Sequence, residues 1–321
     1  MYNFENNPFY NLQSIDDFFQ IIEIEKKSPV NYLCSDKLYN IIKIDNHKPF
    51  QVPIKILDSI HNKTKIILSC IDLPDNVFAP SIKGRKKSSI THALFHKNSK
   101  YLLAIDIKSF FENIDIKYII KFFSNSLKVE YKTACIISKI LTYNNHIARG
   151  SCVSPILAHL SIHKVVENIN QYCTDKNILF SIYMDDIILS SNNKFDFDRA
   201  ISFVKKNLSL VNLNINYKKL RRYNYSDDKR VTGIIITKNN KIKIPNKNRK
   251  QIIEKLKYVE KYFLKVLEKD NINYNELKKE LQSINGIFNY LEQIEYNFLK
   301  SYKEKIIKKC TKIINDKNDV K

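Results

Sequence analysis

Tyr183-Met184-Asp185-Asp186 is the stretch that decides the fold, because it sets two adjacent carboxylates between apolar runs at residues 178–182 and 187–189. Two short apolar runs joined by a polar segment are typical of two strands connected by a turn. Acidic dipeptides are also common in turns that simply face water, so the pair alone predicts little chemistry. It gains meaning only if a further carboxylate lies beside it in the folded chain.

A second run that is typical of a strand ends in such a carboxylate. Residues 101–106 read Tyr-Leu-Leu-Ala-Ile-Asp, a nearly continuous apolar run of the kind found in buried strands. We therefore expect Asp106, Asp185 and Asp186 to converge at the ends of central strands. Carboxylate oxygens suit Mg²⁺ that also binds substrate phosphates, and two such ions can activate an attacking oxygen and stabilise a leaving one. The three aspartates predict a metal-dependent phosphoryl-transfer site.

The composition indicates that this basic chain binds a polyanionic partner. The chain has 321 residues and a formal net charge of +21, from 54 Lys and Arg against 33 Asp and Glu. The length allows one large domain or two to three subdomains. The basic excess favours nucleic acid as a partner, although AT-rich coding would also enrich lysine.

The cysteines and the apolar runs indicate where the protein works. The six cysteines lack a spacing typical of zinc sites, so we expect reduced thiols. No signal peptide is evident, and no apolar run approaches the length of a membrane span. We expect a bacterial cytoplasmic protein without a membrane partner.

Gly150 is one of only four glycines in the chain. It lies in the segment Ala148-Arg149-Gly150-Ser151-Cys152-Val153-Ser154-Pro155, which precedes a helical pattern. Ser154 suits the N-cap of that helix, and Pro155 suits its first helical position. We expect a glycine turn that brings backbone against a template strand, with an ordinary loop before a helix as the alternative.

Together these segments resemble reverse transcriptases, most closely those of bacterial retrons. The order matches: Asp106 followed by two phenylalanines, the segment around Gly150, the tetrapeptide at 183–186, an Asn and Lys pair, and Val231-Thr232-Gly233. The last tripeptide is the most discriminating, because retron enzymes carry it in a family-specific region. A second such region has the form Asn-Ala-x-x-His, and here it reads His92-Ala93-Leu94-Phe95-His96.

The resemblance implies roles for the carboxylates and for one aromatic residue. Asp106, Asp185 and Asp186 become the family's ligands of two Mg²⁺ ions, with the first two as the direct ligands. Phe111 falls where the family keeps an aromatic gate that collides with a 2'-hydroxyl and so selects deoxynucleoside triphosphates. Phe110 and Phe111 are alternatives for this position, and we expect one to pack in the core and the other to gate.

The resemblance also implies contacts to the triphosphate and the template. Lys219 falls where the family has a lysine that contacts or protonates the departing pyrophosphate, with Lys218 as the alternative. Lys48 takes the place of an arginine that meets the triphosphate, so the charge is kept and the bidentate fork is lost. Arg149 and Gly150 lie where the family usually has Pro-Gln-Gly, so a guanidinium replaces the amide that contacts the template.

RNA binding is implied for the two retron-specific regions and for a basic C-terminal stretch. Residues 238–257 hold eight basic residues against one acid, Glu254, and such a stretch either binds phosphates or forms a solvated face. The predicted RNA-binding residues are His92, His96, Val231, Thr232, Gly233, Lys247, Arg249 and Lys250.

The expected fold class is α+β, as a right-hand polymerase with fingers, a palm built on an antiparallel sheet, and a helical thumb. Residues 1–97 are expected to form N-terminal helices and fingers. Residues 98–237, in which strands alternate with helices, are expected to form the palm with inserted finger segments. Residues 238–321 are expected to form a helical basic thumb.

The resemblance implies an RNA-directed DNA polymerase of the retron type. Such an enzyme uses a structured noncoding RNA as template, primes from a 2'-hydroxyl, and makes branched RNA-linked single-stranded DNA in antiphage defence with an effector protein. Two alternatives stay open. One is a non-retron defence reverse transcriptase of the abortive-infection type, and the other is a catalytically idle RNA-binding scaffold.

Overall fold

The computed structural model describes residues 2–25, 28–45, 48–78, 87–267, 274–295, 298, 300 and 304. The chain forms two compact units. The first comprises Met1–His92 and Asn98–Ser226, and the second comprises Ala93–Lys97 and Asp227–Lys321. This boundary lies before residue 238, where the thumb is expected to begin, and the division into fingers, palm and thumb stays a prediction.

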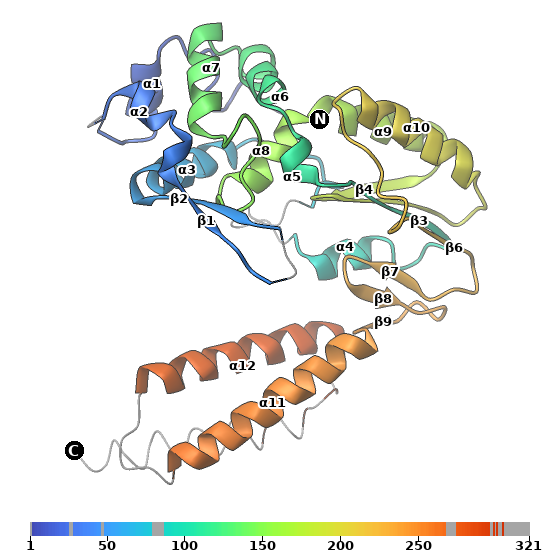
Figure 1. Ribbon diagram of the computed structural model, residues 1–321. Coiled ribbons are helices and arrows are strands. Elements are labelled where there is room, and N and C mark those ends of the chain that lie inside the picture. The colour runs from blue at the N-terminus through green and yellow to red at the C-terminus, as the bar shows by residue number, and fades with distance from the viewer. Residues whose placement is uncertain are drawn as a thin grey trace. The chain divides into compact units, whose positions relative to one another are not determined.

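The main sheet of the first unit has four antiparallel strands in the order β4-β5-β3-β6. Figure 1 labels three of them, β4, β3 and β6. Its strands are β3 (Tyr101–Asp106), β4 (Leu179–Tyr183), β5 (Asp186–Ser191) and β6 (Arg221–Tyr223). The central strands β3 and β5 are apolar and buried along most of their length, without the alternation of a sheet that has one face in water. This combination of an antiparallel sheet with separate helices confirms the predicted α+β class.

β4 and β5 form the expected hairpin, with Met184 and Asp185 as its turn. Tyr183 pairs with Asp186 on one side of β5, and Asp106 pairs with Asp186 on the other. Met184 has a φ of 58°, the positive value that short hairpin turns require. This register brings the end of β3 level with the acidic turn.

Two amphipathic helices, α9 (His163–Asp175) and α10 (Phe197–Ser209), lie side by side next to this sheet (Figure 1). The rings of Tyr172 and Phe203 stack between them, with their centroids 4.1 Å apart. Asp196 caps α10, because its carboxylate accepts a hydrogen bond from the backbone N–H of Arg199. The two helices thus cover apolar surface that the strands would otherwise expose.

The remainder of the first unit consists of short helices and a two-stranded antiparallel sheet, β1 with β2, that surround one hydrophobic core. Helix α4 (Ser89–Phe95) crosses the boundary between the two units. The other elements are α1 (Ile15–Ile21), α2 (Val30–Leu33), the 3₁₀ turn η1 (Asp36–Leu38), β1 (Tyr39–Ile42), β2 (Phe50–Pro53), α3 (Lys55–Leu68), α5 (Phe110–Asn113), α6 (Ile116–Lys121), the π-helical turn η2 (Phe122–Ser126), α7 (Tyr131–Ile140) and α8 (Ser154–Ser161).

The helix expected after Gly150 exists, but its predicted cap is wrong. Helix α8 begins at Ser154, and its N-cap is Val153, which makes no side-chain capping hydrogen bond. The hydroxyl of Ser154 instead donates to the backbone carbonyl of Ala148 and closes the preceding loop. Pro155 lies in the first turn of the helix, where its missing N–H costs no hydrogen bond.

The second unit combines a small sheet with two long helices. Its antiparallel strands are β7 (Lys229–Val231), β8 (Ile234–Ile236) and β9 (Ile242–Lys243), in that order. The helices are α11 (Asn246–Leu267) and α12 (Tyr274–Ile294), which lie against each other in Figure 1 and bury Leu256, Val259, Ile284, Phe288 and Leu291. The helical part therefore starts at Asn246, later than residue 238, because Ile242 and Lys243 still pair with β8. Within the described residues, no helix is both long and apolar enough to cross a membrane.

Candidate active site

Asp106 ends β3 in a buried position, with 7% of its surface exposed. One carboxylate oxygen, Oδ1, accepts a hydrogen bond from Asn216 Nδ2 at 2.8 Å. The other, Oδ2, accepts one from Lys219 Nζ at 2.7 Å. The backbone N–H of Asn216 also donates to the carbonyl of Asp106, at 2.8 Å. The chain that follows residue 215 is thus fixed directly to the aspartate, and its lysine neutralises the carboxylate.

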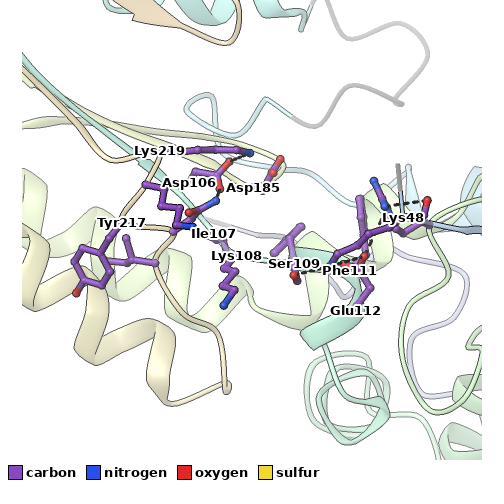
Figure 2. Close-up of a pocket in the computed structure, with 15 residues that line it drawn as sticks. Lys48, Asp106, Ile107, Lys108, Ser109, Phe111, Glu112, Asp185, Tyr217 and Lys219 are labelled. Carbon is purple, nitrogen blue, oxygen red and sulfur yellow. Dashed lines mark hydrogen bonds and ion pairs between the residues drawn. The ribbon is translucent and has the colours of Figure 1, made fainter. Parts of the chain in front are cut away.

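A cavity of about 830 Å³ opens beside Asp106, and it also receives Asp185, Lys219, Lys48 and Phe111 (Figure 2). Its remaining lining residues are Ile107, Lys108, Ser109, Phe110, Glu112, Arg149, Ile215, Asn216, Tyr217 and Lys218. The volume falls in the range of pockets that hold small-molecule ligands. Residues that are separated by more than a hundred positions in the sequence therefore meet at one hollow.

Two of the three predicted aspartates face this cavity. Burial raises the pKa of the Asp185 carboxyl, and the neighbouring charge of Asp106 raises it further. The cations of Lys219 and Arg149 and a backbone hydrogen bond lower this pKa. Asp186 pairs with Asp106 in the sheet but is absent from the cavity lining. Because the carboxylates of Asp106 and Asp185 repel each other, this site favours the binding of an additional positive charge.

Lys219 is the lysine that contacts the aspartate. Its hydrogen bond to Asp106 is the largest cause that raises the pKa of its ammonium, and the charges of Asp106, Asp185 and Asp186 add to the effect. The side chain is still 63% exposed, so the ammonium can also reach a ligand in the cavity. Lys218 lines the same cavity, but the contact with Asp106 distinguishes Lys219 from it.

The opposite end of the cavity gathers cations from two distant segments. Lys48 Nζ donates a 2.7 Å hydrogen bond to the hydroxyl of Ser109 and lies 3.2 Å from Glu112 Oε1. Arg149 Nε lies 3.7 Å from the same Glu112 oxygen, and its guanidinium covers the ring of Phe50 with 5.0 Å to the centroid. The structure thus brings the predicted triphosphate and template contacts, Lys48 and Arg149, into one group.

The comparison with known families decides the class of the protein. The model of the family Reverse transcriptase (RNA-dependent DNA polymerase) matches residues 30–280. The chain belongs to the reverse transcriptase family. The predicted enzyme class, an RNA-directed DNA polymerase, is thereby confirmed, and membership implies an RNA template, a DNA product, deoxynucleoside triphosphate substrates and a divalent metal ion. The match also agrees with the predicted right-hand polymerase fold.

Individual relatives bear out the resemblance to retron enzymes. The chain is 23% identical to the Retron Ec48 reverse transcriptase of Escherichia coli over 340 residues, which span 99% of this chain and 80% of that protein. It is 25% identical to the Retron Se72 reverse transcriptase of Salmonella heidelberg (strain 579083-10) over 263 residues, which span 77% of this chain and 68% of the relative. A solved structure of apo telomerase from Candida tropicalis, truncated from its C-terminal domain, has a TM-score of 0.46 and 12% identity, and the match covers 64% of this chain and 54% of that chain.

The residues of this reverse transcriptase fit a divalent cation at Asp106 and Asp185. Both carboxylates face one cavity, and they lie close enough for one to raise the pKa of the other. Oxygen ligands with a surplus of negative charge are what Mg²⁺ and similar cations bind. Among the described residues, the protein alone does not gather three or more His, Cys, Asp or Glu side chains into a metal site. The role of Asp186 as a further ligand stays a prediction.

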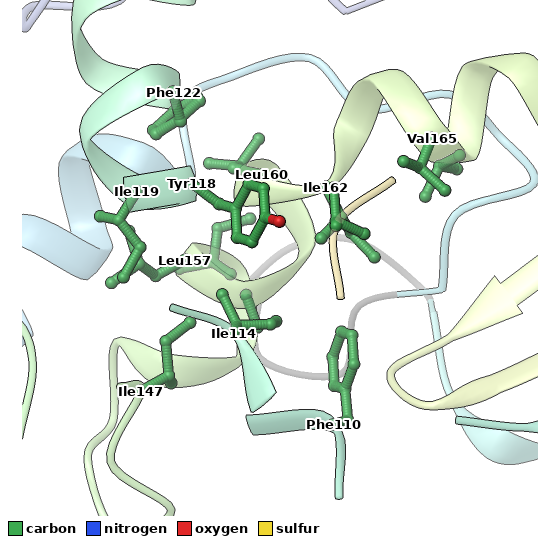
Figure 3. Close-up of a cluster of buried hydrophobic side chains, with 14 of the residues drawn as sticks. Phe110, Ile114, Tyr118, Ile119, Phe122, Ile147, Leu157, Leu160, Ile162 and Val165 are labelled. Atoms are coloured by element: carbon green, nitrogen blue, oxygen red, sulfur yellow. The ribbon is translucent and has the colours of Figure 1, made fainter. Parts of the chain in front are cut away.

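The two neighbouring phenylalanines of the reverse transcriptase both border the cavity, and they differ in burial. Phe110 is buried, and Figure 3 shows its ring with Ile114 and Ile162 among the apolar side chains of the core. Phe111 is only partly buried and lines the cavity together with Asp106. The gate role of Phe111 stays a prediction, and the geometry favours Phe111 over Phe110 for it.

Gly150 owes its residue type to a close approach within the protein. A β-carbon built on Gly150 would lie 2.6 Å from the backbone oxygen of Gln51 and 2.8 Å from Val52 Cγ2. The backbone N–H of Arg149 also donates to Gln51 Oε1 at 3.1 Å. The loop is therefore pressed against β2 of the reverse transcriptase, and a contact of this glycine with the template stays a prediction.

Both histidines that were predicted to bind RNA are fully buried in this reverse transcriptase. His92 Nε2 lies 2.6 Å from Ser181 Oγ, and its ring stacks on Tyr183 with centroids 5.5 Å apart. Burial lowers the pKa of His92 to about 3, so the ring is neutral near pH 7. The ring of His96 meets that of Phe95 edge to face. A direct RNA contact by either ring stays a prediction, and this burial does not favour it.

Val231-Thr232-Gly233 has a clear structural use in the second unit. Val231 ends β7 and is buried, and Thr232 and Gly233 form the turn to β8 with φ values of 41° and 81°. Positive φ at both central positions is typical of a type I′ hairpin turn, where glycine fits without strain and threonine does not. The predicted RNA contact of this tripeptide stays a prediction.

The basic residues of α11 differ in their surroundings. Lys247 is exposed, and Lys250 is exposed with a 3.9 Å ion pair to Glu254. Arg249 instead forms an ion pair with Glu295 and lies over the ring of Phe298, with 4.7 Å to the centroid. Lys247 and Lys250 are thus available to phosphates in the protein alone, whereas Arg249 already has partners within the second unit.

Asn216 is expected from the sequence only as part of the Asn and Lys pair, and its hydrogen bond to Asp106 emerges from the structure. Ser109 and Glu112 are not predicted as members of the active site. Ser109 is a small polar residue of a kind that is common in this chain, and only its contact with Lys48 reveals it. The signal for Glu112 was available, because it directly follows the predicted gate residue. Its two basic partners come from remote segments, which the sequence does not bring together.

Proposed function

We propose that this protein is a retron-type RNA-directed DNA polymerase. It copies a structured noncoding RNA, starts from a 2'-hydroxyl of that RNA, and makes branched RNA-linked single-stranded DNA. It serves antiphage defence together with an effector protein in the bacterial cytoplasm. The retron part is supported by the similarity to proteins named as retron reverse transcriptases and by Val231-Thr232-Gly233, with which it resembles that group.

The observation that carries the polymerase site is the shared cavity of Asp106, Asp185 and Lys219, with Lys48 and Arg149 at its other end. Asp106 and Asp185, assisted by Asp186, would hold two Mg²⁺ ions. When bound, these ions would supply activation of the attacking hydroxyl and stabilisation of the leaving oxygen. The positive residues at the two ends suit a triphosphate, because its negative charge would otherwise be repelled by the neighbouring carboxylates.

Lys219 acts on the departing pyrophosphate. Like any lysine it is protonated near pH 7, and the hydrogen bond to Asp106 raises its pKa further, so its ammonium neutralises charge on phosphate oxygens as the bond to the leaving group breaks. Lys48 and Arg149 bind the triphosphate and orient it, and Arg149 in addition meets the template beside Gly150. Phe111 lies against the sugar and excludes ribonucleotides by a collision with their 2'-hydroxyl.

The test for the retron proposal is the chemical nature of the nucleic acid bound to the protein. The protein is expressed with the DNA that flanks its gene, purified, and its nucleic acid is treated with a debranching enzyme. We expect DNA that is joined to RNA and that debranching releases. Unbranched DNA alone from an active preparation would contradict the retron proposal and favour the non-retron defence enzyme.

A variant with Asp185→Asn and Asp186→Asn distinguishes the enzyme from an idle scaffold. We expect that this variant loses DNA synthesis and keeps RNA binding, because binding rests mainly on phosphate contacts of basic residues. If phage defence persists in cells that carry the variant, the scaffold alternative is favoured.

A further inference from the structure

Glu112 is an acid in the part of the cavity where an anionic substrate is expected. It lies on the short helix α5, and its Oε1 oxygen faces both Lys48 Nζ at 3.2 Å and Arg149 Nε at 3.7 Å. In Figure 2, Lys48, Ser109 and Glu112 lie together at one side of the cavity, apart from Asp106 and Lys219. One carboxylate therefore occupies the space between the two cations that would otherwise face the cavity as a pair.

The two cations keep other contacts that do not involve Glu112. Lys48 Nζ donates to Ser109 Oγ at 2.7 Å. The guanidinium of Arg149 covers the ring of Phe50, and its Nη1 lies 3.4 Å from the backbone oxygen of Lys48. These contacts hold both side chains near their present positions if the carboxylate withdraws. The carboxylate of Glu112 is therefore not needed to position Lys48 and Arg149, and we expect it to affect ligand binding through its charge.

The group is open enough for a substrate to compete. The side chains of Lys48, Glu112 and Arg149 are 55%, 31% and 26% exposed. Ion pairs with this degree of exposure are weak, because water and salt screen them. A triphosphate offers several charged oxygens in place of one carboxylate, and it meets electrostatic repulsion from Glu112 as long as that carboxylate stays in place.

We propose that Glu112 is the counter-ion that a nucleoside triphosphate displaces from Lys48 and Arg149, so that its charge limits how tightly the enzyme binds its substrate. This inference rests on the proposed function, in which the two cations bind the triphosphate. Glu112 determines substrate affinity, and it acts through the two cations without a contact to the reacting atoms.

The test is Glu112→Gln, which keeps the shape and removes the charge. We expect the KM for deoxynucleoside triphosphates to fall about two- to fivefold, the effect of one partly screened charge. Isothermal titration with inorganic tripolyphosphate in the presence of EDTA should show binding that is tighter by the same factor. This second measurement requires neither metal nor chemistry. Glu112→Ser should shift both values in the same direction and replaces the glutamine variant if that one does not fold.

Two controls assign the effect to the local group. Glu23→Gln removes an acid that pairs with Lys63 outside the cavity, and it should leave the KM unchanged. In a background with Lys48→Gln and Arg149→Gln, the added Glu112→Gln should change the KM by less than about 1.5-fold, because coupled residues lose their mutual effect.

An unchanged or higher KM in a folded Glu112→Gln enzyme would overturn the inference. An equal gain from Glu23→Gln, or an undiminished gain in the background without the two cations, would do the same. A failure of the proposed triphosphate role looks different, because Lys48→Gln with Arg149→Gln would then leave the KM at the wild-type value.

Discussion

Replacing Gly150 with alanine adds a methyl group where the structure has no space for one. The new β-carbon would lie 2.6 Å from the backbone oxygen of Gln51, 2.9 Å from its carbonyl carbon, and 2.8 Å from Val52 Cγ2. The valine methyl can rotate away, but the carbonyl belongs to β2 and is fixed by the pairing of that strand with β1. Either the loop or the strand must shift.

Overpacking of this kind costs about 1 to 3 kcal/mol of the free energy of unfolding. In a unit of this size, each kcal/mol lowers Tm by about 2 to 4 °C, so we expect Gly150→Ala to melt about 2 to 12 °C lower. The shift of the loop also moves Arg149, whose backbone N–H is bound to Gln51. We therefore expect a higher KM for deoxynucleoside triphosphates as well.

Thermal unfolding and steady-state kinetics measure both effects, and Gly286→Ala is the matched control. A β-carbon on Gly286 meets no atom within 4 Å, and the residue lies inside helix α12. Alanine favours a helix there by about 1 kcal/mol, so the control should be as stable as the wild type or more stable. A Gly150→Ala enzyme with wild-type Tm and KM would refute the close approach of the loop to β2.

Three further predictions concern the active site and the buried histidines. Lys219→Met should lower kcat about a hundredfold, whereas Lys218→Met should lower it less than threefold, as measured by single-nucleotide extension; equal losses would contradict the assignment. Phe111→Val should raise ribonucleotide incorporation relative to deoxynucleotides by about tenfold or more, and an unchanged ratio would exclude a gate. The buried histidines are His61, His92 and His159, and burial holds their pKa values in the folded protein near 3 to 4. In the unfolded chain the same histidines take up protons below about pH 6.5, so they should lower the free energy of unfolding by about 4 kcal/mol between pH 7.5 and 5.5. Urea unfolding measures this loss, and a free energy of unfolding that stays constant or rises would contradict it.

The hairpin and its carboxylates could be predicted because their signals are local. Strand runs that end in Asp106 and flank Asp185 follow from hydrophobic patterning, which records burial directly. The cap of α8 could not be predicted in the same way. Ser154 is a residue type that N-caps favour and it precedes a proline, yet its hydroxyl binds the carbonyl of Ala148, and this competing contact exists only once the loop has folded.

The group of charged residues at one end of the cavity could not be predicted from the sequence either. Lys48, Glu112 and Arg149 meet because the strand β2 and the loop at Gly150 pack together, and no sequence period reports such a contact. The burial of His92 was equally hidden. A polar ring in a basic chain suggests an exposed contact, but Ser181 and the ring of Tyr183 give it partners inside the protein.

The most direct measurement is DNA synthesis on an RNA template by purified Asp106→Asn enzyme, with Asp198→Asn as the control. Asp198 pairs with Arg222 on the surface and does not line the cavity. We predict that Asp106→Asn lowers the extension rate at least about a thousandfold, whereas Asp198→Asn extends at the wild-type rate. RNA binding should stay within about twofold in both, because phosphate contacts dominate it. Extension by folded Asp106→Asn enzyme at the wild-type rate would contradict the assignment of this cavity as the polymerase site.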